Sequence, residues 1–308
     1  MEFNEIYSQL GILFLTMLVG LILGKINLIT PIATKFLSKF VLKVAIPALL
    51  ISGMLIPLTS EKLHTAFVIL LLSIPSYGLA YLVGKITAKL LTKDTNDKAI
   101  FTYALVFSNA GFIGFPVFLA LFGKEALFYA VIYNIAYNVF MYTLGMKIIT
   151  ANNKTNNKMD LKLLLNSGII ASVIGFFLFV TQIQLPEFIV GTIDSIGSLC
   201  VPLSMLTIGA MLSELPLKSM FSDYRIYFLT FVRLLLLPVL ILILLKYIFK
   251  LEDIWLIAIP VITAGMPVGT SIVMMSIEYD KNSALASQAI LISTLFSCLT
   301  IPLLAHFI

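Results

Sequence analysis

Long apolar runs follow one another along almost the whole chain and are separated by short polar segments. A helix needs about 20 apolar residues to cross the hydrocarbon core of a bilayer, and most runs have that length. The pattern therefore predicts an all-α, polytopic membrane protein with about ten transmembrane helices. The predicted spans lie near residues 5–24, 37–56, 66–88, 99–122, 126–149, 161–181, 192–212, 225–247, 254–277 and 284–306.

One polar interruption is longer than the others. It reads TANNKTNNKMD at residues 150–160, and its Asn and Lys content is typical of a surface loop. It separates residues 1–149 from residues 161–308, and each part contains five predicted spans. We therefore expect two five-helix repeats joined by a linker at residues 150–160.

The two parts resemble each other in the spacing of their prolines and polar segments. Pro31 and Pro186 are 155 positions apart, as are Pro47 and Pro202, and the polar segments GKEA and DKNS recur at an offset of 157. With an odd number of spans, the second repeat must begin on the opposite side of the membrane from the first. The sequence therefore predicts inverted repeats, an architecture typical of secondary transporters.

The composition excludes a soluble domain, because 60% of the residues are hydrophobic and only 11% are charged, with a mean hydropathy of +1.07. The formal net charge of +5 does not indicate nucleic-acid binding, since the basic residues lie in short loops. Thirteen of them fall in odd-numbered loops or at the span ends beside them, and four in or beside even-numbered loops. Basic loops stay cytoplasmic, so we expect a multi-pass protein of the cytoplasmic membrane with both termini outside and residues 150–160 inside.

The fourth predicted span is interrupted by FSNAGFIGFPV at residues 107–117. Gly111 and Gly114 permit backbone angles that other residues resist, and Pro116 lacks an amide hydrogen. Proline suits the first turn of a helix. We therefore expect one half-helix to end near Asn109 and another to begin near Pro116.

The ninth predicted span is interrupted at the corresponding place by TAGMPVGTS at residues 263–271. One interpretation is a pair of ordinary proline kinks. The other is a cargo site, because irregular backbone at membrane depth lines a wet cavity or is buried in protein, and paired broken helices are typical of transporters.

Half-helix N-termini attract carboxylates, and neither break contains Asp, Glu, Lys or Arg. A small organic anion is therefore the expected substrate. The predicted substrate-binding residues are Asn109, Gly111, Gly114, Pro116, Gly265, Met266, Pro267, Thr270 and Ser271.

Five polar residues inside the spans are candidates for coupling or gating. Arg233 either reaches the predicted cavity or extends back to the surface, and Asp194 either caps a helix start or carries a proton. Gln288, Asn134 and Asn138 either bond helices together or line a cation site. No cofactor or resident metal is expected. The coupling ion, H+ or Na+, stays open, with a Na+ site near Asn109 and Gln288 as one alternative.

Four segments together carry a family resemblance. NAGFIGFP at 109–116, AIP at 45–47, VPLSMLTIGAML at 201–212 and GMPVGTS at 265–271 make the chain similar to the auxin efflux carrier family. Bacterial members of that family include malate and malonate permease-like proteins, and bile acid sodium symporters are related to it.

The resemblance implies ten helices with two crossing broken helices, and export or exchange of organic anions by an elevator-like motion. It also implies that Asn109, the backbone from Gly111 to Pro116, and Pro267 with its neighbours contact the cargo. The plant members carry a long loop between the halves, and the segment at residues 150–160 of this chain is too short to correspond to it.

A secondary transporter, or permease, for small organic anions by alternating access is thus the main prediction. Its alternatives are a sodium-coupled symporter of the bile-acid type and a membrane sensor that binds ligand without moving it. An enzyme is disfavoured, because no paired Asp, metal-ligand spacing or phosphate-binding loop occurs. The expected partners are the organic anion, the lipid bilayer and a second copy of the chain in a homodimer, with no nucleic acid.

Overall fold

The computed structural model describes residues 3–151, 166–214 and 223–307, with side chains from residue 7 onward. Across these residues the backbone is helical, without a strand, and the only β-type pairing is an isolated bridge between Ser108 and Val268. The predicted all-α class is thereby confirmed for these residues. The predicted linker at 150–160 lies outside the described residues beyond Ala151, and the inverted repeats stay a prediction.

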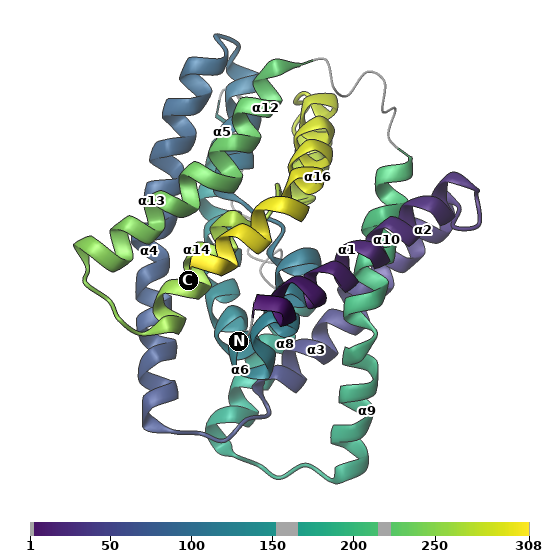
Figure 1. The fold of residues 1–308 in the computed structure, drawn as a ribbon, viewed down its shortest axis with the longest axis vertical. Coiled ribbons are helices and arrows are strands. Elements are labelled where there is room, and N and C mark those ends of the chain that lie inside the picture. Colours follow the sequence, from purple (N-terminus) through teal and green to yellow (C-terminus); the bar gives the residue numbers. More distant parts are fainter. Residues whose placement is uncertain (1–2, 152–165, 215–222, 308) are drawn as a thin grey trace. The chain divides into compact units, whose positions relative to one another are not determined.

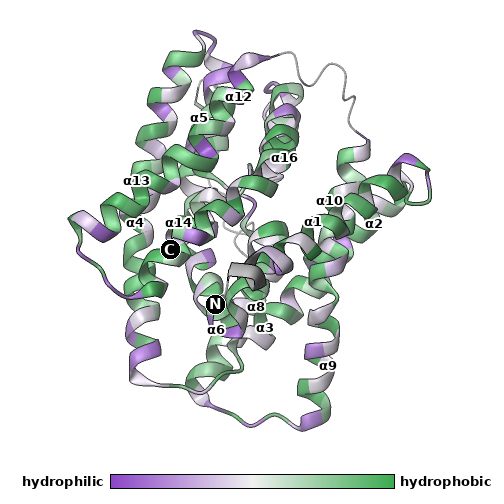
Figure 2. Ribbon diagram, in the orientation of Figure 1, coloured by the Kyte–Doolittle hydropathy of each residue, from purple (hydrophilic) through white to green (hydrophobic). Residues whose placement is uncertain are grey.

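Seven helices in the described part of the chain are long and apolar enough to cross a membrane. Figure 2 shows hydrophobic residues along most of their length and hydrophilic residues gathered near turns and helix ends. Two further apolar helices are shorter, Ser167–Thr181 and Ile254–Gly265. The count differs from ten mainly because the predicted spans 99–122 and 254–277 are each broken, and because the helical stretch Ala110–Ile149 joins parts of two predicted spans. That stretch is itself interrupted at Gly123, where φ is 74°.

The chain folds into two compact units, and each takes segments from both halves of the sequence. Unit 1 consists of Met1–Phe67, Gly111–Ile135 and Leu164–Leu215, and unit 2 of Val68–Ala110, Ala136–Leu163 and Pro216–Ile308. The helices that lie wholly in unit 1 are α1 (Phe3–Lys25), α2 (Pro31–Phe40), η1 (Val41–Ala45), α3 (Ile46–Met54), α8 (Ser167–Thr181), α9 (Glu187–Ser198) and α10 (Cys200–Ser213) (Figure 1).

Unit 1 is built around close helix pairs. Helix α1 packs along α10, and α3 packs against α8 and α9. A β-carbon at Gly20 of α1 would overlap the backbone of Leu206, and one at Gly209 of α10 would overlap the carbonyl oxygen of Met17. The two helix backbones are therefore in direct contact, as small residues allow in membrane helices.

Unit 2 contains most of α4 (Ser60–Leu91) and the helices that carry both breaks. Helix α13 packs on α14, and α16 packs on both α12 and α15. The helices of unit 2 are α5 (Thr95–Val106), η3 (Met141–Gly145), α7 (Met146–Ile149), α12 (Tyr224–Phe231), η5 (Val232–Leu236), α13 (Leu237–Ile243), η6 (Leu244–Ile248), α14 (Ile254–Gly265), α15 (Ser271–Glu278) and α16 (Ser283–Phe307).

Three prolines follow π-helical turns. Pro47, Pro116 and Pro238 each occupy the second position of the helix that follows η1, η2 (Ala110–Gly114) or η5. Proline cannot donate to the carbonyl four residues back, and its ring pushes that carbonyl away, so a wider turn before it relieves the conflict.

The prediction that a half-helix begins near Pro116 is therefore wrong. Helical backbone resumes at Ala110, and Pro116 lies inside the continuing helix, at the second residue of α6 (Phe115–Phe140).

Candidate functional site

Two irregular segments of unit 2 interrupt otherwise helical spans and pair with each other. Residues 107–109 separate α5 from η2, and residues 266–270 separate α14 from α15. The segments run antiparallel, since the Asn109 N–H donates to the Pro267 carbonyl over 2.8 Å and the Gly269 N–H donates to the Phe107 carbonyl over 3.1 Å. Both predicted interruptions are thus present, and we refer to residues 107–109 and 266–270 as the paired breaks.

The fit between the paired breaks depends on a glycine and on a serine from a third helix. A β-carbon at Gly269 would lie 2.8 Å from the Ser108 carbonyl oxygen, so a side chain there would push the segments apart. The Val268 N–H donates to the Ser293 hydroxyl of α16 over 3.0 Å. This bond satisfies a backbone donor that the unwound chain would otherwise leave buried.

Arg233 of η5 connects the helix ends that lead into the breaks. Its side chain is 1% exposed. Nε donates to the Met266 carbonyl over 3.0 Å, and Nη1 donates to the Leu105 carbonyl over 2.5 Å. These carbonyls lie at the C-terminal ends of α14 and α5, where helix dipoles are negative. Arg233 therefore does not extend to the surface, and its charge stabilises both helix ends.

Aromatic rings and hydroxyl groups surround the first break. The Phe107 ring lies 4.7 Å from Tyr103, 5.8 Å from Tyr137 and 6.3 Å from Tyr77, measured between ring centroids. The Tyr137 hydroxyl donates to the Ser108 carbonyl over 3.0 Å. The Tyr103 hydroxyl donates to the Ser271 hydroxyl over 3.2 Å, and Ser271 is the first residue of α15. Uncharged hydroxyl groups thus lie beside both segments of the paired breaks.

The predicted substrate-binding residues are distributed over both units. Asn109, which is buried, lies in the paired breaks of unit 2. Gly111 and Gly114 lie in η2 and Pro116 lies in α6, all within the part of the chain that belongs to unit 1. The structure therefore brings together the unit 2 members of the set, and contact of any member with cargo stays a prediction. These unit 2 members are Asn109, Gly265, Met266, Pro267, Thr270 and Ser271.

Three amides proposed for packing or cation binding also occupy different units. Asn138 is buried on the unit 2 part of α6, and Asn134 is half-buried on the unit 1 part. Gln288 is half-buried on α16, five positions before Ser293. A Na+ site near Asn109 and Gln288 stays a prediction.

The prediction that Asp194 caps a helix start is wrong. Helix α9 begins at Glu187, so Asp194 lies in its second turn. Its carboxylate accepts hydrogen bonds from the Ser52 hydroxyl and from Lys124 Nζ, the latter at 3.2 Å. The Asp194 and Lys124 side chains are 40% and 53% exposed. Asp194 therefore takes part in a partly hydrated ion pair of unit 1.

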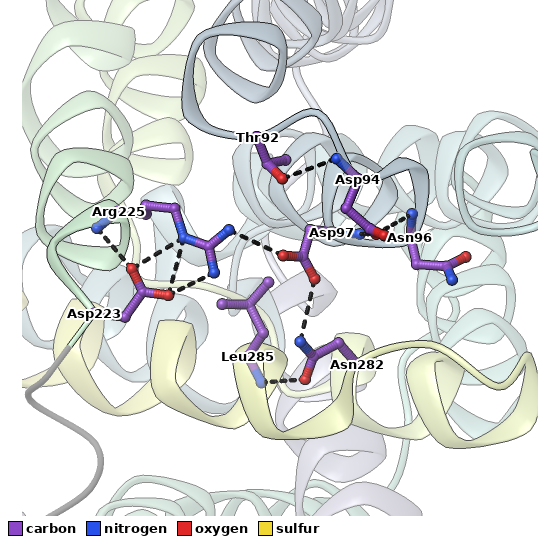
Figure 3. Close-up of polar contacts among 8 residues, drawn as sticks. All are labelled: Thr92, Asp94, Asn96, Asp97, Asp223, Arg225, Asn282 and Leu285. Atoms are coloured by element: carbon purple, nitrogen blue, oxygen red, sulfur yellow. Dashed lines mark hydrogen bonds and ion pairs between the residues drawn. The ribbon is translucent and has the colours of Figure 1, made fainter.

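A second polar cluster lies where three helices of unit 2 begin (Figure 3). Arg225 of α12 pairs with Asp97 of α5 over 3.0 Å and with Asp223 over 2.7 Å. Asn282, which caps α16, donates to Asp97 over 3.1 Å. The hydrogen bonds from Arg225 lower the pKa of Asp223 below its usual value. This cluster ties together three loops that the charge bias assigns to the cytoplasmic side.

Several residues of the site were not predicted. Tyr103, Tyr137 and Ser293 sit in apolar runs, where an aromatic ring or a serine is usually a packing residue. One signal was available for Tyr103, which precedes Phe107 by one helical turn and therefore shares its face. Ser293 carries no such local signal, because its partner Val268 is on another helix.

Comparison with known proteins identifies similarity to membrane transporters. The sequence model of a family described as membrane transport protein matches residues 5–305. The chain is 25% identical over 300 residues to an uncharacterized transporter of Methanothermobacter thermautotrophicus, and the match covers 96% of both chains. It is 32% identical over 145 residues to an uncharacterized transporter of Methanocaldococcus jannaschii, where the match spans 46% of each chain.

Proposed function

The chain belongs to the membrane transport protein family, that of the auxin efflux carriers, and on this premise we propose that it is a secondary active transporter. Its cargo in this proposal is a small organic anion, carried across the cytoplasmic membrane by alternating access. The apolar helices and the family match make it a multi-pass membrane protein. Substrate class, mechanism and membrane are the parts that we propose.

One observation carries the proposal: two unwound segments in the middle of apolar spans bond to each other inside unit 2. Unwound backbone in a membrane is costly unless its polar groups have a use or a partner. The pairing satisfies only some of the groups of each segment by backbone bonds, and side chains contribute further bonds at Val268 and Ser108. A single proline kink needs none of this arrangement, and broken helices that meet at mid-membrane are typical of cargo sites.

The charges around the paired breaks favour an anion. Residues 105–110 and 263–271 contain no acidic side chain, and the buried charge bonded to them is the guanidinium of Arg233. Because Arg233 covers the negative ends of α5 and α14, the positive N-terminus of α15 is not offset by them. Thr270 and Ser271, both half-buried, lie at that N-terminus. We propose that they and Asn109 hydrogen-bond a carboxylate.

Alternating access requires parts that can move as bodies, and the division of the chain into two compact units supports this part of the proposal. The test includes both candidate coupling ions, H+ and Na+, as conditions.

The proposal is tested by thermal shift of the purified protein with short dicarboxylates, longer aliphatic acids, aromatic acids and matched amines. Uptake into proteoliposomes is then measured for the acids that bind, with and without Na+ and across pH. We expect carboxylates to raise Tm and to be transported. Stabilisation by the amines with indifference to carboxylates would overturn the proposal.

Two serines of α15 provide a matched pair of variants. Ser271→Ala removes a hydroxyl at the proposed site, and we expect carboxylate affinity to fall about threefold to tenfold, as for loss of one hydrogen bond. Ser276→Ala removes a fully buried hydroxyl that donates to the Val273 carbonyl over 2.8 Å. This control should leave affinity unchanged, and equal effects of the two variants would remove Ser271 from the site.

A further inference from the structure

A small cavity of unit 2 lies away from the paired breaks, beside α12, η5 and α16. Its volume is about 230 Å³. The rings of Tyr227, Phe231 and Phe296 and two leucines form an apolar lining, to which Thr230 and Thr300 contribute hydroxyl groups. Phe231 and Phe296 are 53% and 43% exposed, so the cavity opens on an apolar outer face of the unit.

The two hydroxyls of this cavity are buried and lack a hydrogen-bond partner within the described structure. Thr230 is 4% exposed and Thr300 is 9% exposed. Other buried hydroxyls of the protein donate to a carbonyl one turn earlier, for example Thr207 to Leu203 over 2.6 Å and Ser76 to Leu72 over 2.7 Å. A buried hydroxyl without a partner is unfavourable. Two of them on one cavity indicate a group that bonds to both.

The lining restricts the chemistry of that group. A hydroxyl needs an acceptor for its proton, and among the described residues no charged side chain lines the cavity, so a neutral oxygen fits better than a carboxylate. The apolar walls suit a hydrocarbon portion beside the oxygen. At about 30 Å³ per water-sized group, the cavity holds roughly seven or eight such groups, which is a section of one chain and not a whole lipid.

The position along α12 agrees with a lipid. Thr230 follows Arg225 by five residues, or about 8 Å along a helix. Arg225 belongs to the polar cluster where α5, α12 and α16 begin (Figure 3). The headgroup layer of a bilayer adds roughly 5 to 8 Å to each side of the hydrocarbon core. Thr230 therefore lies at about the depth of glycerol linkages when the polar cluster lies among headgroups.

We propose that this cavity binds a membrane glycerolipid, with Thr230 and Thr300 donating hydrogen bonds to a glycerol-linkage oxygen and the lining rings covering the start of its chain. Ester and ether linkages both offer such an acceptor. The site is separate from the paired breaks and does not depend on the proposed cargo.

The test uses the double variant Thr230→Val/Thr300→Val, which removes both hydroxyls at nearly constant shape. The purified full chain is stripped of lipid in detergent, and Tm is measured with and without dioleoyl phosphatidylcholine, its dialkyl ether analogue, or hexadecane. In the lipid-free state we expect the double variant to melt above the wild type, since two unpaired buried groups are gone. With either phospholipid, Tm should rise more for the wild type than for the double variant. The lipid concentration that gives half of the maximal rise in Tm should be at least about threefold higher for the variant.

Thr294→Val is the matched control, because Thr294 of α16 is also buried without a partner but does not line the cavity. It should raise lipid-free Tm and leave the response to phospholipid unchanged. The proposal is overturned by equal phospholipid responses of the double variant and the wild type. A response of the wild type to hexadecane as large as to phospholipid would also overturn it, since the oxygen would then play no part. Thr300→Val alone gives the same comparison if the double variant does not fold.

Discussion

Unit 1 and unit 2 hold their helices together by different means. In unit 1, α1 and α10 approach until backbone meets backbone, at Gly20 and Gly209. In unit 2, an arginine, a tyrosine and a serine hydrogen-bond the irregular backbone between helices. Unit 1 therefore depends on the absence of side chains, and unit 2 on the presence of particular ones.

The two ways of holding helices together meet different requirements. Packing through small residues satisfies all backbone bonds inside each helix and leaves nothing for a ligand. Unwound backbone held by side chains keeps polar groups at membrane depth, where a polar molecule can use them. The same lipid environment thus accommodates a close helix pair in one unit and unwound backbone held by side chains in the other.

The largest effect that would test this comparison is expected at Arg233. Arg233→Met leaves the Leu105 and Met266 carbonyls buried without their donor, at a cost of about 1–3 kcal/mol for each group. We expect lower Tm and transport per folded molecule reduced at least about 100-fold, equivalent to about 3 kcal/mol. Thermal unfolding and proteoliposome uptake measure the two quantities.

Substitutions with Lys and Gln sharpen the result at Arg233. Arg233→Lys keeps the charge but loses the planar fork that reaches two carbonyls, so it should recover part of the activity. Arg233→Gln keeps a donor without the charge and should recover less. Wild-type transport by folded Arg233→Met protein would show that the arginine only supports the fold.

A smaller effect is expected from crowding the helix contact of unit 1. A β-carbon at Gly20 would overlap the Leu206 backbone, whereas one at Gly11 of the same helix would meet open space. Gly20→Ala should destabilise by about 1–3 kcal/mol through overpacking. Gly11→Ala should be neutral or stabilising by up to about 1 kcal/mol. Equal Tm values for the two variants would show that the close contact does not support unit 1.

The smallest effect is expected at the exposed ion pair of unit 1. Asp194→Asn removes a charge that faces Lys124 but keeps an acceptor for Ser52. Because both charged side chains are about half-exposed, the change in stability should stay within about 1 kcal/mol. The pH profile of transport should not move. A shifted pH profile of transport with unchanged Tm would instead assign proton coupling to Asp194, and with it a functional group of the transporter to unit 1.

The sequence was informative where the cause of a structure is local. Gly265, Pro267 and Asn109 mark the two interruptions because glycine, proline and asparagine alter backbone preference at their own positions. The same reasoning failed at Pro116, since a π turn before the proline accommodates it without ending the helix. It failed at Asp194 because the helix begins at Glu187, five residues before the predicted span 192–212.

Contacts between distant segments could not be predicted in the same way. The partners of Arg233 lie 128 and 33 positions away, and choosing them requires the register of three helices. The aromatic surroundings of Phe107 have the same origin, with Tyr137 arriving from α6. A single sequence contains such residues without indicating which of them meet.

The contact between α1 and α10 also bears on how the protein is made. Gly20 and Leu206 are 186 positions apart, so the first helix leaves the ribosome long before its neighbour has been synthesised. During that interval α1 has to persist in the bilayer on its own apolar character, with its glycine face against lipid. Pairing of α1 with α10 is therefore a late association of helices already inserted, and translation arrested before residue 200 would yield an embedded chain without this contact.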